Sequence, residues 1–302
     1  MKTHIGLAAA LLAFGACSAS ALDIVGFDPV LNNRFSSGFA TAPVPNVSAS
    51  FIGAGYDFSG VGWNPAAPQQ NFAMISDRYF LYATHFAPGG SISFVSPALS
   101  TANPGNPAAA VVTYSVSATT FRAISTSLGL PGDVSVGMLT TALNPAHAIS
   151  HYPLLVLPTS NDYIGQSMLI YGYSGTPLSS PRVGRNVFEG LFALDFYGDP
   201  APDIQTFGYD SDPAPTGEAS LVAGDSGGPT FIPVNGALAL VGIHSEVGNV
   251  GAVPYSFDSY LPDYYPSIAA QGIPAAVVPE PSQAALAILG FGMLAAQRRR
   301  SR

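Results

Sequence analysis

The chain has 302 residues, of which 48% are apolar and only 9% are charged, so it can build the core of one large domain or of two packed halves. Its 32 glycines and 27 prolines interrupt the chain too often for long helices and favour an all-β fold. The formal net charge of −8 argues against nucleic acid and anionic lipid as partners, because like charges repel.

Residues 1–21 have the pattern of a secretory signal peptide. Lys2 supplies the basic start, Ile5–Phe14 the apolar stretch, and Ala19-Ser20-Ala21 the small residues of a cleavage site. We therefore expect export from the cell and a mature protein that begins at Leu22. A helix of the folded core is the alternative interpretation of this stretch.

The single cysteine, Cys17, lies within this leader. The mature domain therefore has no disulfide, and its stability must come from packing. A lipid anchor attached at Cys17 is a weaker alternative, because Phe14 stands where lipoprotein signals usually carry leucine.

Short apolar runs between turn signals begin at Phe72, after a stretch rich in Gly, Pro and Ser. Such runs are typical of a β-sandwich or of β-barrels. The predicted strands are Phe72–Ile75, Tyr79–Ala83, Ser91–Val95, Ala110–Ser117, Val134–Leu139, Leu154–Leu157, Ser167–Tyr173, Val187–Phe196, Thr230–Pro233 and Ala237–His244. We interpret Asp199–Glu218 as an acidic loop and residues 269–277 as a linker.

The segment Gly224-Asp225-Ser226-Gly227-Gly228-Pro229 carries the strongest chemical signal. A serine hydroxyl becomes a good nucleophile only when a base removes its proton and amide groups receive the developing oxyanion. Glycines beside Ser226 permit the sharp turn that such an arrangement needs. A glycine-rich hairpin is the structural alternative, so residues elsewhere in the chain must decide.

This segment resembles the nucleophile motif of the trypsin/chymotrypsin family of serine proteases. The apolar run that ends in Ala83-Thr84-His85 is similar to the histidine motif of that family, and Asp133 before the apolar run Val134–Leu139 is similar to its aspartate motif. The three residues also follow the family's order along the chain. The resemblance implies two perpendicular antiparallel β-barrels, residues 22–150 and 151–268, with the active site between them.

The resemblance assigns each residue a role. Ser226 would attack the peptide carbonyl, His85 would accept and later return the proton, and Asp133 would orient His85. The amides of Gly224 and Ser226 would form the oxyanion hole. No cofactor and no metal is implied.

Other titratable residues are alternatives to these. Asp162 and Asp195 are rivals of Asp133, but neither begins an apolar strand in the right place. The remaining histidines of the mature chain, His147, His151 and His244, fit structural roles better than catalytic ones. The acids of the 199–218 loop match no metal-binding spacing, so a solvated loop is the better interpretation.

Three positions suggest the shape of the primary specificity pocket. Ser220 corresponds to the pocket floor of the family, and a neutral hydroxyl there argues against a preference for Arg or Lys. Ser245 and Val247 correspond to the pocket wall, and Glu246 between them replaces the family's usual aromatic residue. Because valine would narrow the pocket, we expect a small or medium apolar residue before the cleaved bond.

Residues 278–302 resemble the PEP-CTERM sorting signal of bacterial envelope proteins. Val278-Pro279-Glu280-Pro281 precedes the apolar run Ala284–Ala296, and Arg298-Arg299-Arg300 follow it. The run is shorter than the about 20 residues of an ordinary membrane span. The resemblance implies removal by an exosortase, and a simple tail anchor is the alternative.

The sequence thus predicts an exported serine endopeptidase with a protein or peptide substrate, located outside the cell or in the bacterial envelope. Signal peptidase and exosortase would be its partners during export, with membrane contact only through the transient tail. A catalytically silent binding protein with the same fold, and an esterase with the same triad, are the alternatives.

Overall fold

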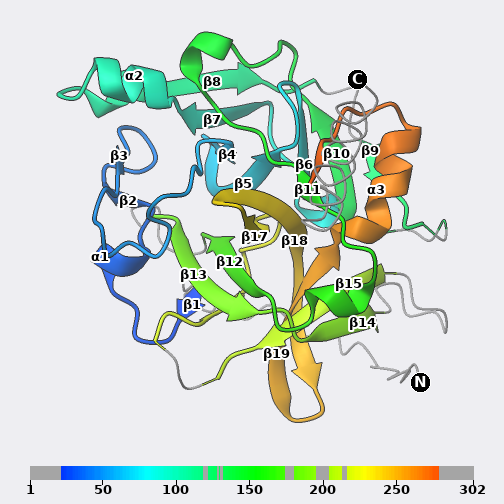
Figure 1. Ribbon diagram of the computed structural model, residues 1–302. Coiled ribbons are helices and arrows are strands. Elements are labelled where there is room, and N and C mark those ends of the chain that lie inside the picture. The colour runs from blue at the N-terminus through cyan, green and yellow to red at the C-terminus, as the bar shows by residue number, and fades with distance from the viewer. Residues whose placement is uncertain are drawn as a thin grey trace, which may run out of the picture.

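The computed structural model describes residues 22–117, 122–127, 129, 132–173, 180–194, 204–212 and 216–278. Most of the regular structure in these residues is β-strand, arranged in two large sheets, and the helices are few and short (Figure 1). The prediction of an all-β fold is confirmed. The leader and nearly all of the predicted sorting signal lie outside the described residues.

The first sheet has seven strands, all antiparallel to their neighbours. In spatial order they are β8 (Val111–Ser115), β7 (Ser91–Val95), β4 (Val61–Asn64), β5 (Ala67–Met74), β6 (Tyr79–Ala83), β10 (Val134–Met138) and β9 (Arg122–Ile124). A bridge between Val116 and Leu139 also joins the end of β8 to the end of β10, so the sheet curls round on itself.

The second sheet has nine strands. Its main path is β13 (Arg182–Val187), β12 (Ser167–Gly172), β17 (Pro229–Val234), β18 (Ala237–Val250), β19 (Val253–Tyr260), β15 (Ile204–Asp210) and β14 (Gly190–Leu194). The short strand β11 (Leu154–Leu155) pairs in parallel with β18 and with β20 (Val277–Val278). The Asn186 amide of β13 donates to the Asp210 carbonyl of β15 at 2.7 Å, which draws these two strands together.

The smaller elements connect or cover the two sheets. They are β1 (Asp23–Ile24) paired with β16 (Ala219–Ser220), β2 (Phe35–Ser37) paired with β3 (Val44–Pro45), and the helices α1 (Pro29–Asn32), α2 (Pro97–Ala102) and α3 (Leu261–Ala270). Each helix has proline in its first turn, where no backbone donor is lost. No helix among the described residues is long and apolar enough to span a membrane.

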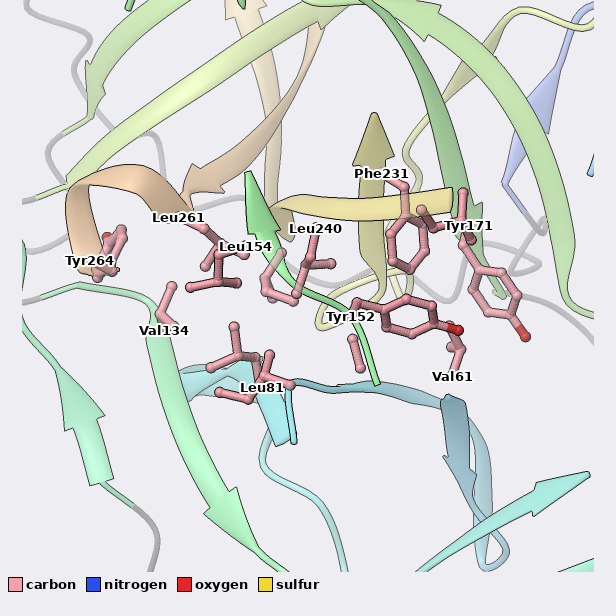
Figure 2. Close-up of a cluster of buried hydrophobic side chains, with 14 of the residues drawn as sticks. Val61, Leu81, Val134, Tyr152, Leu154, Tyr171, Phe231, Leu240, Leu261 and Tyr264 are labelled. Carbon is pink, nitrogen blue, oxygen red and sulfur yellow. The ribbon is translucent and has the colours of Figure 1, made fainter. Parts of the chain in front are cut away.

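The largest hydrophobic cluster lies between the two sheets and holds them together. Figure 2 shows side chains from the first sheet, such as Leu81, opposite side chains from the second, such as Leu240, with Leu154 of β11 beside them. The Tyr152 ring packs edge-on against Phe231, with 4.7 Å between ring centroids. Each large apolar side chain buried here contributes about 1.5–3 kcal/mol, so the junction of the sheets is rigidly packed.

The structure differs from the sequence interpretation in several places. The segment 204–210, interpreted as loop, is strand β15, because Phe207 and Tyr209 are fully buried against the second sheet. The predicted strand 187–196 is interrupted after Val187, where β13 ends, by two irregular residues before β14 begins at Gly190. The segment 269–277, interpreted as a linker, begins within α3 and packs through the buried Ile273 before β20.

The start of the described chain belongs with the second sheet, although the sequence interpretation grouped it with the first half. Asp23 and Ile24 of β1 pair with Ser220 and Ala219 of β16. Leu22 and Ile24 are buried in the hydrophobic cluster of the second half, which is what draws this segment across.

Candidate active site

His85 stands at the end of a buried strand of the first sheet. Strand β6 ends at Ala83, and a single 3-10 turn, Thr84–Phe86, carries His85 out of the sheet. The Thr84 amide donates to the Asp133 carbonyl at 3.1 Å, and its hydroxyl shares a 2.8 Å hydrogen bond with Ser135. The turn is therefore fixed to β10, and the His85 side chain remains 44% exposed at the surface.

Asp133 immediately precedes β10, the neighbour of β6, so pairing of these two strands brings it to His85. Its Oδ2 lies 2.7 Å from His85 Nδ1, and its Oδ1 accepts the His85 amide at 3.1 Å. The Ser245 hydroxyl also donates to Oδ2, at 2.6 Å. The carboxylate is 5% exposed and thus receives three donors in a largely dry position.

Ser226 comes from the second sheet, in the turn between β16 and β17. Its Oγ lies 2.9 Å from His85 Nε2. Gly224 and Gly227, on either side, have φ of +103° and +84°, a backbone region that side chains with a Cβ rarely adopt. The two glycines therefore allow the turn that presents the Ser226 hydroxyl to the histidine.

The predicted rivals of Asp133 do not meet His85. The Asp162 carboxylate accepts the amide and hydroxyl of Thr159 in a local turn. Asp195 lies outside the described residues. His147 bonds the Tyr114 hydroxyl at 2.7 Å, on the far part of the first sheet. The described residues contain no group of three or more metal-binding side chains.

The two predicted oxyanion donors, the amides of Gly224 and Ser226, form no hydrogen bond with any residue that the structure describes. The amides around them do: Asp225 donates to Val222, Gly227 to His244 and Gly228 to Asp225, at 2.9–3.1 Å. The backbone is thus fixed on both sides of two free donors, as an anion site requires.

The pKa of His85 is raised above its ordinary value. The hydrogen bond to Asp133 is the largest cause, burial of the ring opposes it, and the negative charges of Asp133 and Glu246 add to it. The Glu246 side chain is exposed, and its carboxylate forms no hydrogen bond with any residue of the described ranges. The sequence identified Glu246 only as a departure from the family, without a role.

Two of the three predicted pocket residues, Ser220 on β16 and Val247 on β18, lie on strands that are both linked to Ser256 of β19. Val247 pairs with Ser256 across β18 and β19, and the Ser256 hydroxyl accepts the amide of Leu221, the neighbour of Ser220, at 2.9 Å. Val247 is 44% exposed. Ser256 was not predicted from the sequence, because no motif marks it.

Ser245, the third predicted pocket residue, contacts the proposed catalytic residues directly. Its hydroxyl donates to Asp133, and the residue is 5% exposed. A register shift between His244 and Glu246, relative to β19, makes Ser245 the extra residue of a bulge. The bulge turns its side chain into the site, where it supports the carboxylate.

Comparison with solved structures identifies the fold. An atomic-resolution structure of HBP is 15% identical in sequence and matches with a TM-score of 0.51, over 74% of this chain and 96% of that chain. A structure of human heparin binding protein is 14% identical, with a TM-score of 0.48 over the same shares. No protein-family model and no curated protein matches the chain. The predicted chymotrypsin-like fold is confirmed, and identity this low shows the fold alone.

Proposed function

We propose that this protein is an exported serine endopeptidase that uses Ser226, His85 and Asp133. The observation that carries the proposal is the continuous contact from Asp133 Oδ2 to His85 Nδ1, at 2.7 Å, and from His85 Nε2 to Ser226 Oγ, at 2.9 Å. These three residues lie far apart in the sequence, and Ser226 comes from a different sheet from His85 and Asp133. A surface serine has no structural need for such an arrangement.

The proton positions follow from the acceptors. A carboxylate only accepts hydrogen bonds, so His85 Nδ1 carries the proton toward Asp133 and Nε2 is left as the acceptor for the Ser226 hydroxyl. Ser226 Oγ then attacks the carbonyl carbon as its proton passes to Nε2. The resulting imidazolium is stabilised by Asp133 and gives the proton to the leaving amine, and water repeats the sequence to release the acyl group.

The Gly224 and Ser226 amides would bind the negatively charged oxygen of the tetrahedral intermediate. Neither amide has a hydrogen-bond partner among the residues that the structure describes, which supports this role. Loss of one such donor typically lowers the rate about 10²–10³-fold.

The specificity that we propose is for small or medium apolar residues before the cleaved bond. Ser220 is neutral, which argues against a preference for Arg or Lys, and the side chain of Val247 would narrow the pocket. Peptides with Ala, Val, Phe or Arg at this position test the preference. We expect Ala and Val to be cleaved fastest, and faster cleavage after Arg would contradict it.

Export and maturation at Leu22 remain part of the proposal. The resemblance to the family implies that a freed chain start can pair with the acid before the nucleophile, here Asp225. Leu22 is fully buried, and both its side chain and Asp225 Oδ1 border the space beside Gly172. N-terminal sequencing of the secreted protein should find Leu22, and a start at Ile24 would contradict cleavage at this site.

The structural neighbour is named for binding heparin, but we do not propose heparin binding for this chain. Heparin is a polyanion, whereas this chain has a formal net charge of −8 and 10 basic residues against 18 acidic ones.

Ser226→Ala tests the proposed function. The variant should fold normally and lose hydrolysis of a denatured protein substrate by about 10⁶-fold, since the nucleophile and its base act as a unit. Parallel assays with peptide and ester substrates separate an endopeptidase from an esterase. If the wild-type protein cleaves neither, or Ser226→Ala cleaves as fast, the binding-protein alternative replaces this proposal.

A further inference from the structure

His244 is a fully buried histidine with both ring nitrogens hydrogen-bonded to acceptors. Nδ1 lies 2.8 Å from Asp258 Oδ1, and Nε2 lies 2.9 Å from the Tyr171 carbonyl oxygen. A carbonyl cannot donate, so Nε2 must carry a proton, and an ionised Asp258 requires a second proton on Nδ1. The geometry therefore fits a buried imidazolium paired with a carboxylate.

The electrostatic surroundings agree with a charged ring. Burial by itself lowers the pKa of His244, but the attraction and hydrogen bond of Asp258, the charge of Asp225 and the bond to the Tyr171 carbonyl together raise it above its ordinary value. The sequence alone suggested only a hydrogen-bonded core residue.

His244 is joined directly to the turn that carries Ser226. Its carbonyl accepts the Gly227 amide at 2.9 Å, and its own amide donates to the Gly228 carbonyl at 2.8 Å. A Cβ on Gly228 would lie 2.7 Å from the Cδ2 atom of the His244 ring, so the ring packs directly beneath this turn. Any change in His244 therefore acts on the residues next to Ser226.

Asp225, the residue before Ser226, is an acid that needs a buried counter-charge. It is 1% exposed, and its Oδ2 accepts the Val222 amide at 3.0 Å, while Oδ1 lies against Gly172. Burial raises the pKa of Asp225 to about 7, and the Val222 amide, the positive charges of His244 and Arg182, and the Tyr173 amide act in the opposite direction.

The ionisable groups facing this region come from five other strands. They are His244 of β18, Asp258 of β19, Arg182 of β13, Tyr209 of β15 and Asp23 of β1. Arg182 also donates to the Leu22 carbonyl at 3.0 Å and stacks on the Phe27 ring, so its charge is shared with the chain start. His244 is the cation that packs beneath the turn itself.

We propose that His244 and Asp258 are positioning residues: the buried imidazolium, held by Asp258 beneath the turn, favours the ionised form of Asp225 and so supports the turn that presents Ser226 and the amides of Gly224 and Ser226. The effect of His244 and Asp258 on catalysis rests on the proposed function. The charge states of His244, Asp258 and Asp225 do not depend on that function.

The experiment is a titration followed by NMR in the mature protein with Ser226→Ala, which removes self-digestion. Histidine labelled with ¹⁵N reports whether both nitrogens of His244 are protonated, and aspartate labelled with ¹³C reports the pKa of Asp225. The signals are assigned with His244→Gln and Asp225→Asn. We expect His244 to be an imidazolium at neutral pH. Adding His244→Gln should raise the pKa of Asp225 above its value in the Ser226→Ala protein.

Asp258→Asn is the second variant, in case His244→Gln does not fold. It keeps the ring but removes the carboxylate that holds its proton, so the pKa of Asp225 should again rise. Ile243→Val is the matched control, since it removes one buried methylene from the same strand and should leave this pKa unchanged. A neutral His244, or a pKa of Asp225 that does not move in either variant, overturns the proposal.

Labelling of Ser226 by a fluorophosphonate, in chains that retain the serine, tests the catalytic consequence. In His244→Gln the labelling rate near neutral pH should fall about tenfold relative to Ile243→Val and recover toward alkaline pH, where Asp225 ionises. An unchanged pH profile with a shifted Asp225 pKa would overturn the positioning role. A wild-type protein that is never labelled would refute the proposed endopeptidase, while the titration would still decide the charge state.

Discussion

At the scale of single residues, two acids influence the His85 ring in different ways. Asp133 is buried and bonded to the ring, whereas Glu246 is exposed and acts on it only through its charge. Both favour the protonated ring, so both raise the pH at which His85 becomes available as a base. The acid limb of the pH–rate profile therefore depends on Glu246.

Glu246→Gln should shift that acid limb to lower pH. Removing the negative charge lowers the pKa of His85, so the neutral ring persists further into the acid range. The measurement is the rate of Ser226 labelling as a function of pH. Glu189→Gln is the control, because it removes an equal charge that instead bonds the Tyr255 hydroxyl. A limb that stays in place, or moves to higher pH, contradicts the role assigned to Glu246.

Single residues also show where sequence reasoning succeeds and fails. His85, Asp133 and Ser226 could be selected from motifs, because those motifs set each residue type beside an apolar strand or glycines. The hydrogen bond from Ser245 to Asp133 was not predicted from the sequence. The reason is the bulge in β18, where Ser245 is one extra residue relative to β19. A bulge reverses the face of the sheet on which a side chain lies, and no motif in the sequence marks it.

At the scale of elements, the Ser226 turn leaves no room for a side chain at Gly228. A Cβ on Gly228 would stand 2.6 Å from the Tyr171 carbonyl oxygen and 2.7 Å from the His244 ring. The Tyr171 carbonyl and the His244 ring are buried and hydrogen-bonded to each other, so neither can move away without breaking that hydrogen bond.

Gly228→Ala should therefore lower the free energy of unfolding by about 1–3 kcal/mol, the usual cost of forcing extra atoms into a packed interior. Labelling of Ser226 should slow as well, because the turn must shift. Gly90→Ala is the matched control: its Cβ would meet nothing within 4 Å, and its φ is not in the left-handed region. Equal stability of the two variants in thermal unfolding would contradict this account of the turn.

Two strand segments that were not predicted from the sequence share a physical cause. Strand β15 is flanked by prolines and acids, and β18 continues past His244 through exposed residues that lack alternating apolar side chains. Their strand form comes from hydrogen bonds to β19, a partner distant from β15 in sequence. Strands such as β6 and β7, whose apolar character is local, were placed correctly at Tyr79–Ala83 and Ser91–Val95.

At the scale of the whole molecule, the site exists only where the two sheets meet. His85 and Asp133 come from the first sheet and Ser226 from the second, and the cluster around Leu81, Leu154 and Leu240 sets the distance between them (Figure 2). The described chain contains no cysteine, so packing must supply this rigidity. The two halves are therefore expected to unfold together.

Leu240→Ala tests this coupling. The side chain is fully buried and β18 pairs there with β11, so truncation should cost about 2–5 kcal/mol of stability. Trp63, the single tryptophan, reports on the first sheet by fluorescence, while circular dichroism reports on all strands. In denaturant, both signals should shift together. A tryptophan transition that stays at the wild-type midpoint would show that the halves unfold independently.

The central claim is that Ser226 is activated by His85 and Asp133, and the most direct measurement is intact-mass and peptide mapping of the secreted protein after fluorophosphonate treatment. The account predicts one adduct per chain, located on Ser226, with labelling strongly slowed in His85→Ala and absent in Ser226→Ala. A folded wild-type protein that acquires no adduct, or acquires it on another residue, would contradict the account.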